Sequence, residues 1–238
     1  MSLDRVPPAP EVKVEADNAI AAARSLVYAE LARAFRHPSD AEAARLLADG
    51  TAVRELIGLV DGLARWRPAY SASPLRHEAR EASGDDVNVL YCSLFDGAIG
   101  GATVSLDERA YAASGRELLW EDLFRCYAHF GLEVEGGGLS ESPDHLTIEL
   151  EFMHFLTFLE ASNPETARGV LLGERDFLAL HLAAWMPRLC ESIAARSTGS
   201  VYHRLAELLR DFVSADREYL ESRTNELRRS PNGIHSPV

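Results

Sequence analysis

The sequence has 238 residues, 47% of them hydrophobic, so the chain is long and apolar enough to bury a substantial core. Its 24 basic and 37 acidic residues give a formal net charge of −13, which argues against binding to nucleic acid or to anionic lipid. The cysteines, Cys92, Cys126 and Cys190, match no disulfide or zinc spacing, which indicates a reducing compartment. Neither a secretory signal nor a run of about 18 apolar residues occurs, so we expect a cytoplasmic protein without stable membrane insertion.

Apolar residues recur at helical spacing along nearly the whole chain, and alternating strand-like runs are scarce, which predicts an all-α protein. A first helix is predicted from Asp17 to Phe35, and it ends before His37-Pro38. A second begins with Ser39 as its cap and ends at Asp49-Gly50. A third begins with Thr51 as its cap and runs to about Trp66.

The middle of the chain alternates between helical patterns and glycine-rich breaks. A helix is predicted over Asp85 to Phe95, a loop over Asp96 to Ser105, and a helix over Asp107 to Phe130 with a break near Ser114-Gly115. Gly136-Gly137-Gly138 is the clearest linker in the sequence and predicts a hinge between two halves of the chain.

The C-terminal part is predicted to hold the central helix of a bundle. Ser142-Pro143 has the residue types of a helix start, and the helix that it opens, Asp144 to Ala161, is apolar nearly all round. Two further helices are predicted, one over Asp176 to Arg196 with a kink at Pro187 and one over Val201 to Leu227.

Together these elements predict an all-α bundle of about nine to eleven helices in a single domain over residues 16–228. Its N-terminal half (16–131) and C-terminal half (143–228) would be joined by a hinge at 132–142. Residues 1–15 are expected to form a disordered tail, and residues 229–238 a flexible one.

Motifs for catalysis are missing from the sequence: it has no phosphate-binding loop, dinucleotide fingerprint, nucleophile elbow or H-E-x-x-H motif. We therefore assign no catalytic residue and expect no enzyme activity. The cysteines lie in apolar helical patterns, which is typical of core residues. Trp66, Trp120 and Trp185 have the same spacing, which favours the core over the alternative that they line a peptide groove.

One group of side chains has metal-binding character: Asp144, His145, Glu149, Glu151 and His154. Glu151 and His154 have the Glu-x-x-His spacing of di-iron bundles, but the chain has no second copy of it. At about 100° per residue, the pairs His145–Glu149 and Glu151–His154 fall on opposite sides of a helix. No metal site is therefore predicted. A di-iron-like metal-binding enzyme and a generic helical scaffold or regulator are kept as alternatives.

The run from Glu141 to Met153, ESPDHLTIELEFM, resembles the signature of the TorD/DmsD/NarJ chaperones of molybdoenzymes, E-x-P-D-H-L-x-x-E-L-x-F-M/L. Three further stretches resemble that family in order and spacing: Leu90 to Phe95, Glu117 to Gly131, and Phe177 to Pro187. Four ordered matches are far more specific than one. The chain departs from the family after Phe95, where it reads DGAIGG instead of the frequent Gly-Pro-Gly.

The resemblance implies a TorD-like chaperone that binds the N-terminal leader, often a twin-arginine signal, of a molybdopterin-containing oxidoreductase catalytic subunit. Such a chaperone holds the precursor until cofactor insertion and withholds it from export. An acidic protein with an apolar groove suits this partner, because a leader supplies two arginines and an apolar helical stretch.

The family's leader-binding residues match Asp144 and His145 of this chain, and we expect Asp144 and Glu141 to contact the leader's arginines. By proximity the predicted peptide-binding set is extended to the following residues: Pro143, Tyr91, Leu94, Phe95 and Trp120. No cofactor is expected, and binding of a guanine nucleotide is suggested by family analogy alone. The same analogy leaves the oligomeric state open between a monomer and a domain-swapped dimer.

Overall fold

The computed structural model describes residues 10–71, 86–96, 103–112, 115–132, 141–163 and 166–229. Within these ranges the chain forms nine α-helices and three shorter helical turns, and it contains no β-strand. The predicted all-α bundle is therefore confirmed. None of the described helices is both long enough and apolar enough to cross a membrane.

The N-terminal helices are α1 (Pro10–Phe35), α2 (Ala41–Ala48) and α3 (Thr51–Ala64). Helix α1 begins with a proline, whose fixed φ suits the first helical turn, and it takes up residues 10–15 of the segment predicted as a tail. The cap of α2 is Asp40 rather than the predicted Ser39. The backbone at Asp40 is extended, and its carboxylate accepts a hydrogen bond from the backbone N–H of Ala43 (3.1 Å).

The middle of the chain is more broken than predicted. It comprises η1 (Pro68–Ser71), α4 (Val87–Tyr91), the π-helical turn η3 (Cys92–Asp96), the 3₁₀ turn η4 (Glu108–Ala110) and α5 (Arg116–His129). The break predicted near residues 114–115 is confirmed, because extended backbone at Gly115 precedes α5. The predicted linker 136–138 lies outside the described residues.

The C-terminal helices are α6 (Leu146–Ser162), α7 (Ala167–Leu180), α8 (Leu182–Ser197) and α9 (Val201–Arg229). The single helix predicted over 176–196 is wrong: α7 and α8 meet at His181, whose backbone (φ −113°, ψ −95°) leaves the helical region. Pro187, where the kink was predicted, lies inside α8. The break therefore occurs where a buried side chain is held, and not at the proline.

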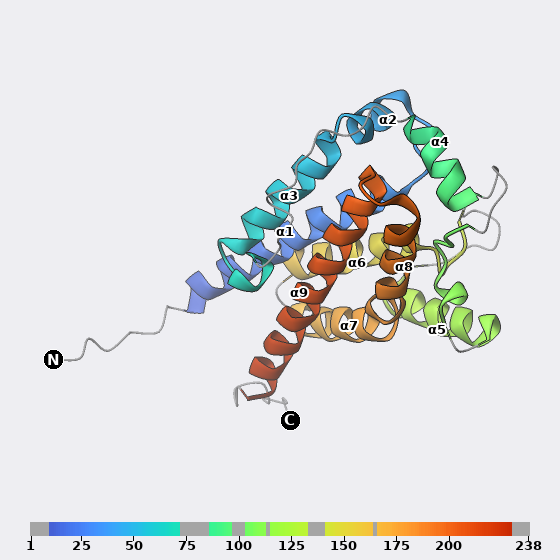
Figure 1. The fold of residues 1–238 in the computed structure, drawn as a ribbon. Helices are drawn as coiled ribbons and strands as arrows, with labels where there is room; N and C mark the ends of the chain where they lie inside the picture. Colours follow the sequence, from blue (N-terminus) through green and yellow to red (C-terminus); the bar gives the residue numbers. More distant parts are fainter. Residues whose placement is uncertain are drawn as a thin grey trace.

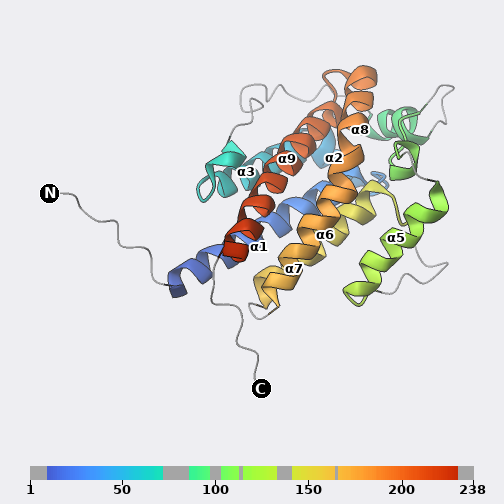
Figure 2. The same cartoon turned by 90° about the horizontal axis from the view of Figure 1, so that it is seen from below.

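Helix α6 is central, as its apolar sequence predicted. Leu146, Leu150, Met153 and Leu156 are completely buried. Helix α1 lies along α6, while α9 packs against α7 and α8 (Figure 1). Seen from below, α5 lies at the periphery of the bundle (Figure 2). Because α1 packs on α6, the two predicted halves share one hydrophobic core.

A buried ionic network joins helices α1, α6, α7 and α9. The completely buried guanidinium of Arg24 on α1 donates to Asp216 on α9 (2.5 and 3.0 Å), Glu160 on α6 (2.8 Å) and Glu174 on α7 (2.5 Å). Burial raises the pKa of both glutamates, an effect that the charge of Arg24 opposes. One arginine thus fixes the relative positions of α1, α6, α7 and α9.

Candidate functional site

The start of α6 is joined to residues 103–107 by a short antiparallel contact. The backbone N–H of Leu146 donates to the carbonyl of Leu106, and the N–H of Glu108 donates to the carbonyl of Asp144, both at 2.8 Å. These bonds tie Asp144, which lies in a turn, and His145, whose backbone is extended, to the segment 106–108. Helix α6 therefore begins at Leu146 and not at Asp144, where the sequence predicted it.

His145 replaces Ser142 as the cap of α6. Its Nδ1 accepts a hydrogen bond from the backbone N–H of Thr147 (3.3 Å), which requires an unprotonated nitrogen. Burial lowers the pKa of His145, which favours this neutral form. The hydroxyl of Ser142 instead donates to Asp107 (2.8 Å) and accepts from the guanidinium of Arg109 (3.1 Å).

The carboxylate of Asp144 is completely buried and bonded to two residues. Its Oδ1 accepts from the indole N–H of Trp120 and from the guanidinium of Arg109, both at 2.8 Å. Its Oδ2 accepts from the backbone N–H of Arg109 (3.1 Å). Asp144 therefore positions Trp120 and Arg109. A direct contact with a leader arginine stays a prediction, and it would require that arginine to displace Arg109.

The other predicted residues of this signature differ in exposure. Pro143 is buried, and its carbonyl accepts a hydrogen bond from the hydroxyl of Tyr127 (2.7 Å). His145 is 8% exposed. The carboxylate of Glu141 lies 3.7 Å from Nε2 of His145 and is nearly half-exposed. Of these three side chains, Glu141 is the one that presents a charge to solvent.

Tyr91, Leu94 and Phe95 form a second group, packed on α9. The rings of Tyr91 and Phe95 lie 4.9 Å apart, and both contact Tyr202, at 5.8 and 5.2 Å. Tyr91 and Leu94 are buried, while Phe95 is half-buried. The carbonyl of Leu94 accepts from the backbone N–H of Val104 (2.9 Å), so residues 104–107 connect this group to the start of α6.

Helix α5 carries an exposed face that is both acidic and aromatic. Glu117, Trp120, Glu121 and Phe124 recur at intervals of three and four residues, so they share one side of the helix. The rings of Trp120 and Phe124 lie 6.4 Å apart, and Phe124 is 38% exposed. Glu117 and Glu121 are exposed. We call these four residues the α5 face.

A cluster of buried ionisable side chains lies beneath this region. Nδ1 of His181 is 3.1 Å from a carboxylate oxygen of Glu108, and the indole N–H of Trp185 donates to Glu149 (3.0 Å). Glu108, Glu149 and His181 are all buried, so the cluster is closed to a substrate. Its contacts join η4, α6 and the α7–α8 break, which supports a structural role.

Protonation in this cluster follows from burial and neighbouring charge. Burial and the negative charge of Glu108 raise the pKa of Glu149 well above its usual range, which favours a neutral carboxyl. Burial alone would lower the pKa of His181. Hydrogen bonding with Cys126 and Glu108 and the charge of Glu108 outweigh it and raise this pKa to about 10.

The residues considered for a di-iron site have separate partners. The carboxylate of Glu151 pairs with Arg36, and Nδ1 of His154 lies 2.8 Å from the hydroxyl of Ser25. Glu149 points toward Trp185 instead. These side chains therefore do not converge on one ion, as the helix geometry predicted.

The prediction that the cysteines and tryptophans lie in the core is confirmed for Cys190 and Trp185, which are buried. Trp66 is 53% exposed, so its prediction is wrong. Three side chains are half-buried: Cys92, Cys126 and Trp120.

Arg109, the main partner of Asp144, was not singled out by the sequence. The two residues are 35 positions apart, and no motif relates them. His181 does lie in a stretch that resembles the chaperone family, but its pairing with Glu108 spans 73 positions. Such pairings arise from tertiary packing, and the helical periodicity of a sequence does not predict them.

Comparison with known proteins identifies the family. Residues 50–191 match the family model described as nitrate reductase delta subunit. The chain is 30% identical over 82% of its length, and 89% of the relative, to a perchlorate reductase assembly chaperone protein of Dechloromonas aromatica. It is 33% identical over 64% of its length, and 76% of the relative, to a selenate reductase assembly chaperone protein of Thauera selenatis.

Among solved structures, a putative redox enzyme maturation protein from Archaeoglobus fulgidus aligns over 90% of this chain and 99% of its own, with 15% identity and a TM-score of 0.47. The family model covers more than half of the chain, and the relative from Dechloromonas aromatica aligns over most of it. The chain therefore belongs to the nitrate reductase delta subunit family, the TorD/DmsD/NarJ group of maturation chaperones.

Proposed function

We propose that this chain is a cytoplasmic chaperone for the catalytic subunit of a molybdopterin oxidoreductase. It binds the N-terminal leader and the apo form of that subunit, assists cofactor insertion and withholds export until folding is complete. The observation that carries the proposal is family membership together with relatives named as assembly chaperones of perchlorate and selenate reductases. Their names favour a reductase of related type as the client.

The α5 face supports leader binding. Glu117 and Glu121 offer accessible carboxylates to two arginines, and Trp120 and Phe124 offer aromatic surface to the apolar stretch of a leader. The overall charge of −13 would also steer a basic segment toward the protein. Glu141, exposed beside His145, supplies a further carboxylate nearby.

Asp144 contributes to this site by positioning. Its buried carboxylate accepts the indole N–H of Trp120 and so orients this half-buried ring. Arg109 lies over the same ring, 5.9 Å from its centre. The pair therefore fixes one aromatic surface of the α5 face.

Calorimetry with a client's leader tests the proposal. We expect the wild-type chain to bind a leader peptide with two adjacent arginines. The double variant Glu117→Gln/Glu121→Gln should bind it more weakly by about two- to thirtyfold, since each exposed charge pair contributes about 0.2–1 kcal/mol. The matched control Glu191→Gln/Glu218→Gln changes net charge equally at exposed positions on α8 and α9, and should bind like the wild type.

The outcomes separate the site from the function. An equal loss in both double variants would show that only net charge matters, and the α5 face would be wrong. If the wild-type chain bound neither the leader nor the apo subunit, the chaperone proposal itself would be wrong.

A further inference from the structure

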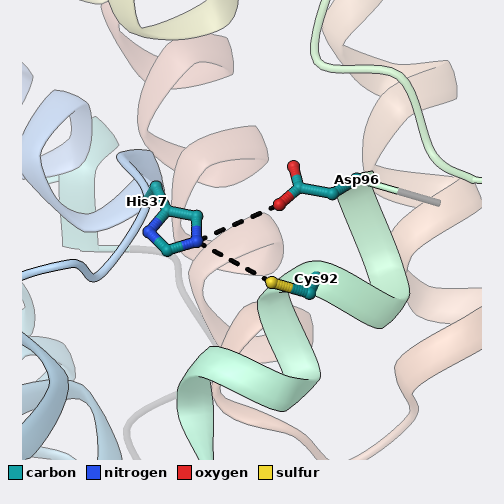
Figure 3. A group of neighbouring side chains, drawn as sticks. All are labelled: His37, Cys92 and Asp96. Carbon is teal, nitrogen blue, oxygen red and sulfur yellow. Dashed lines mark hydrogen bonds and ion pairs between the residues drawn. The ribbon is translucent and has the colours of Figure 1, made fainter. Parts of the chain in front are cut away.

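We propose that His37, Cys92 and Asp96 form a binding site for a divalent transition metal ion of the zinc type. In Figure 3 the three side chains point toward one another from two segments of the chain. Nε2 of His37 is 3.7 Å from Sγ of Cys92 and 4.0 Å from a carboxylate oxygen of Asp96. Within the described ranges this is the one group of three such side chains whose ligand atoms lie close together, all within 4.8 Å.

The separations are near those of a tetrahedral zinc site. Zinc bonds of about 2.0–2.3 Å place neighbouring ligand atoms about 3.3–3.8 Å apart. The His37–Cys92 separation already falls in this range. The His37–Asp96 separation exceeds the value for a nitrogen–oxygen pair, about 3.3–3.5 Å, by about half an ångström, and the Cys92–Asp96 separation is at most 4.8 Å. Small rotations of exposed side chains close such a difference without moving the backbone.

The backbone and one aromatic contact hold the ligands in place. Cys92 and Asp96 are the first and last residues of η3, and a π-helical turn is a rare element that often occurs at functional sites. His37 follows α1, and its ring packs edge-on against the buried ring of Tyr91 at 4.9 Å. The hydroxyl of Tyr91 donates to the carbonyl of Phe35 (3.4 Å), which ties this support to the end of α1.

The donor set favours zinc over magnesium or calcium. An imidazole and a thiolate are borderline and soft ligands, whereas magnesium and calcium require oxygen. Asp96 adds a carboxylate, which zinc also accepts beside nitrogen and sulfur.

The site is open on one side. The side chains of His37 and Asp96 are 45% and 43% exposed, so an ion has access, and water can fill the fourth position. A bound ion would link the end of α1 to η3, beside the rings of Tyr91 and Phe95. The sequence offered no sign of this site, because His37 is 55 positions from Cys92.

Cobalt(II) spectroscopy and zinc competition test the site on the untagged, reduced, full-length chain. We expect one equivalent of cobalt to give a thiolate-to-cobalt charge-transfer band, which Cys92→Ser abolishes. His37→Gln and Asp96→Asn should weaken zinc binding at least about tenfold in competition with a chromogenic chelator. Cys126→Ser and His129→Gln are the matched controls, and both should bind like the wild type.

Unfolding in urea without metal should change by less than about 0.5 kcal/mol in Asp96→Asn, whose side chain is exposed, and by about 0.5–1.5 kcal/mol in His37→Gln, which loses the ring contact with Tyr91. The site would be wrong if the wild-type chain gave no charge-transfer band, if the band persisted in Cys92→Ser, or if zinc bound the wild type no more tightly than Cys92→Ser. These outcomes do not depend on leader binding, so they leave the proposed function unaffected.

Discussion

Replacing Asp144 by asparagine tests whether this residue positions its neighbours or binds the leader directly. An asparagine side chain keeps one oxygen and presents an NH₂ group in place of the other. If the oxygen faces Trp120 and the guanidinium of Arg109, the NH₂ group faces the backbone N–H of Arg109, and two donors meet. In the opposite orientation the NH₂ group faces the indole N–H of Trp120 and the guanidinium of Arg109, so both of these donors lose their acceptor.

The better orientation sets the magnitude. In that orientation the backbone N–H of Arg109 loses its acceptor and faces the new NH₂ group, which costs about 1–3 kcal/mol. The bond from the guanidinium of Arg109 loses its ionic character, which costs about 1 kcal/mol more. Since Arg109 is one-third exposed, solvent offsets part of this loss. We expect Asp144→Asn to lower the free energy of unfolding by about 2–4 kcal/mol, which corresponds to a fall of roughly 5–15 °C in Tm for a chain of this size.

Equilibrium unfolding in urea, followed by tryptophan fluorescence without peptide, measures this effect. The control is Asp176→Asn, which removes an exposed carboxylate paired with Arg175 and should change stability by less than about 0.5 kcal/mol. The reasoning is refuted if Asp144→Asn unfolds like the wild type and yet binds the leader much more weakly. That result would make Asp144 a direct ligand of a leader arginine.

Three further predictions concern the scaffold. Arg24→Met leaves three buried carboxylates without their cation and should lower the free energy of unfolding by about 3–5 kcal/mol in urea. The pKa of His181 near 10 exceeds its unfolded value of about 6.5, so its stabilisation is complete below about pH 6.5 and is lost as pH rises toward 10. Urea midpoints should therefore fall across this window, and fall less in His181→Gln. Gly173→Ala would place a methyl group against the Phe130 ring and cost about 1–3 kcal/mol, whereas Gly169→Ala in the same helix meets open space and should stabilise by about 0.5–1 kcal/mol.

Hydrophobic periodicity predicted helix boundaries well where residues of the helix itself determine where it begins or ends. The apolar stripe of α1 ends at Phe35, as the sequence indicated. The start of α3 was predicted to within one residue, since Gly50 and not Thr51 is its cap. It failed at the start of α6, because backbone bonds to Leu106 and Glu108 tie Asp144 and His145 to another segment and leave His145 extended. It failed again at His181, where a pairing distant in sequence decides the break.

The sequence predicted which residues belong to the candidate site, but not which of them contact one another. The chaperone signature and the matched stretch in α5 drew attention to Asp144 and Trp120, and the structure joins them by a hydrogen bond of 2.8 Å. The signature could not reveal that Arg109 occupies the same carboxylate. The acidic residues of the α5 face carry no motif, and they stand out only once their exposure is known.

The difference between the buried residues of the signature and the exposed residues around it bears on how a client is selected. A signature that resembles those of chaperones for different oxidoreductases cannot by itself distinguish one client from another. Burial of Asp144 fits this expectation, because its completely buried carboxylate joins the start of α6 to Trp120 on α5 and is not exposed to a client. Discrimination is then expected from exposed residues near that joint, such as Glu121, Phe124 and Glu141. Exchanging these residues with those of a relative should change which leader is bound while leaving the free energy of unfolding within about 0.5 kcal/mol per substitution.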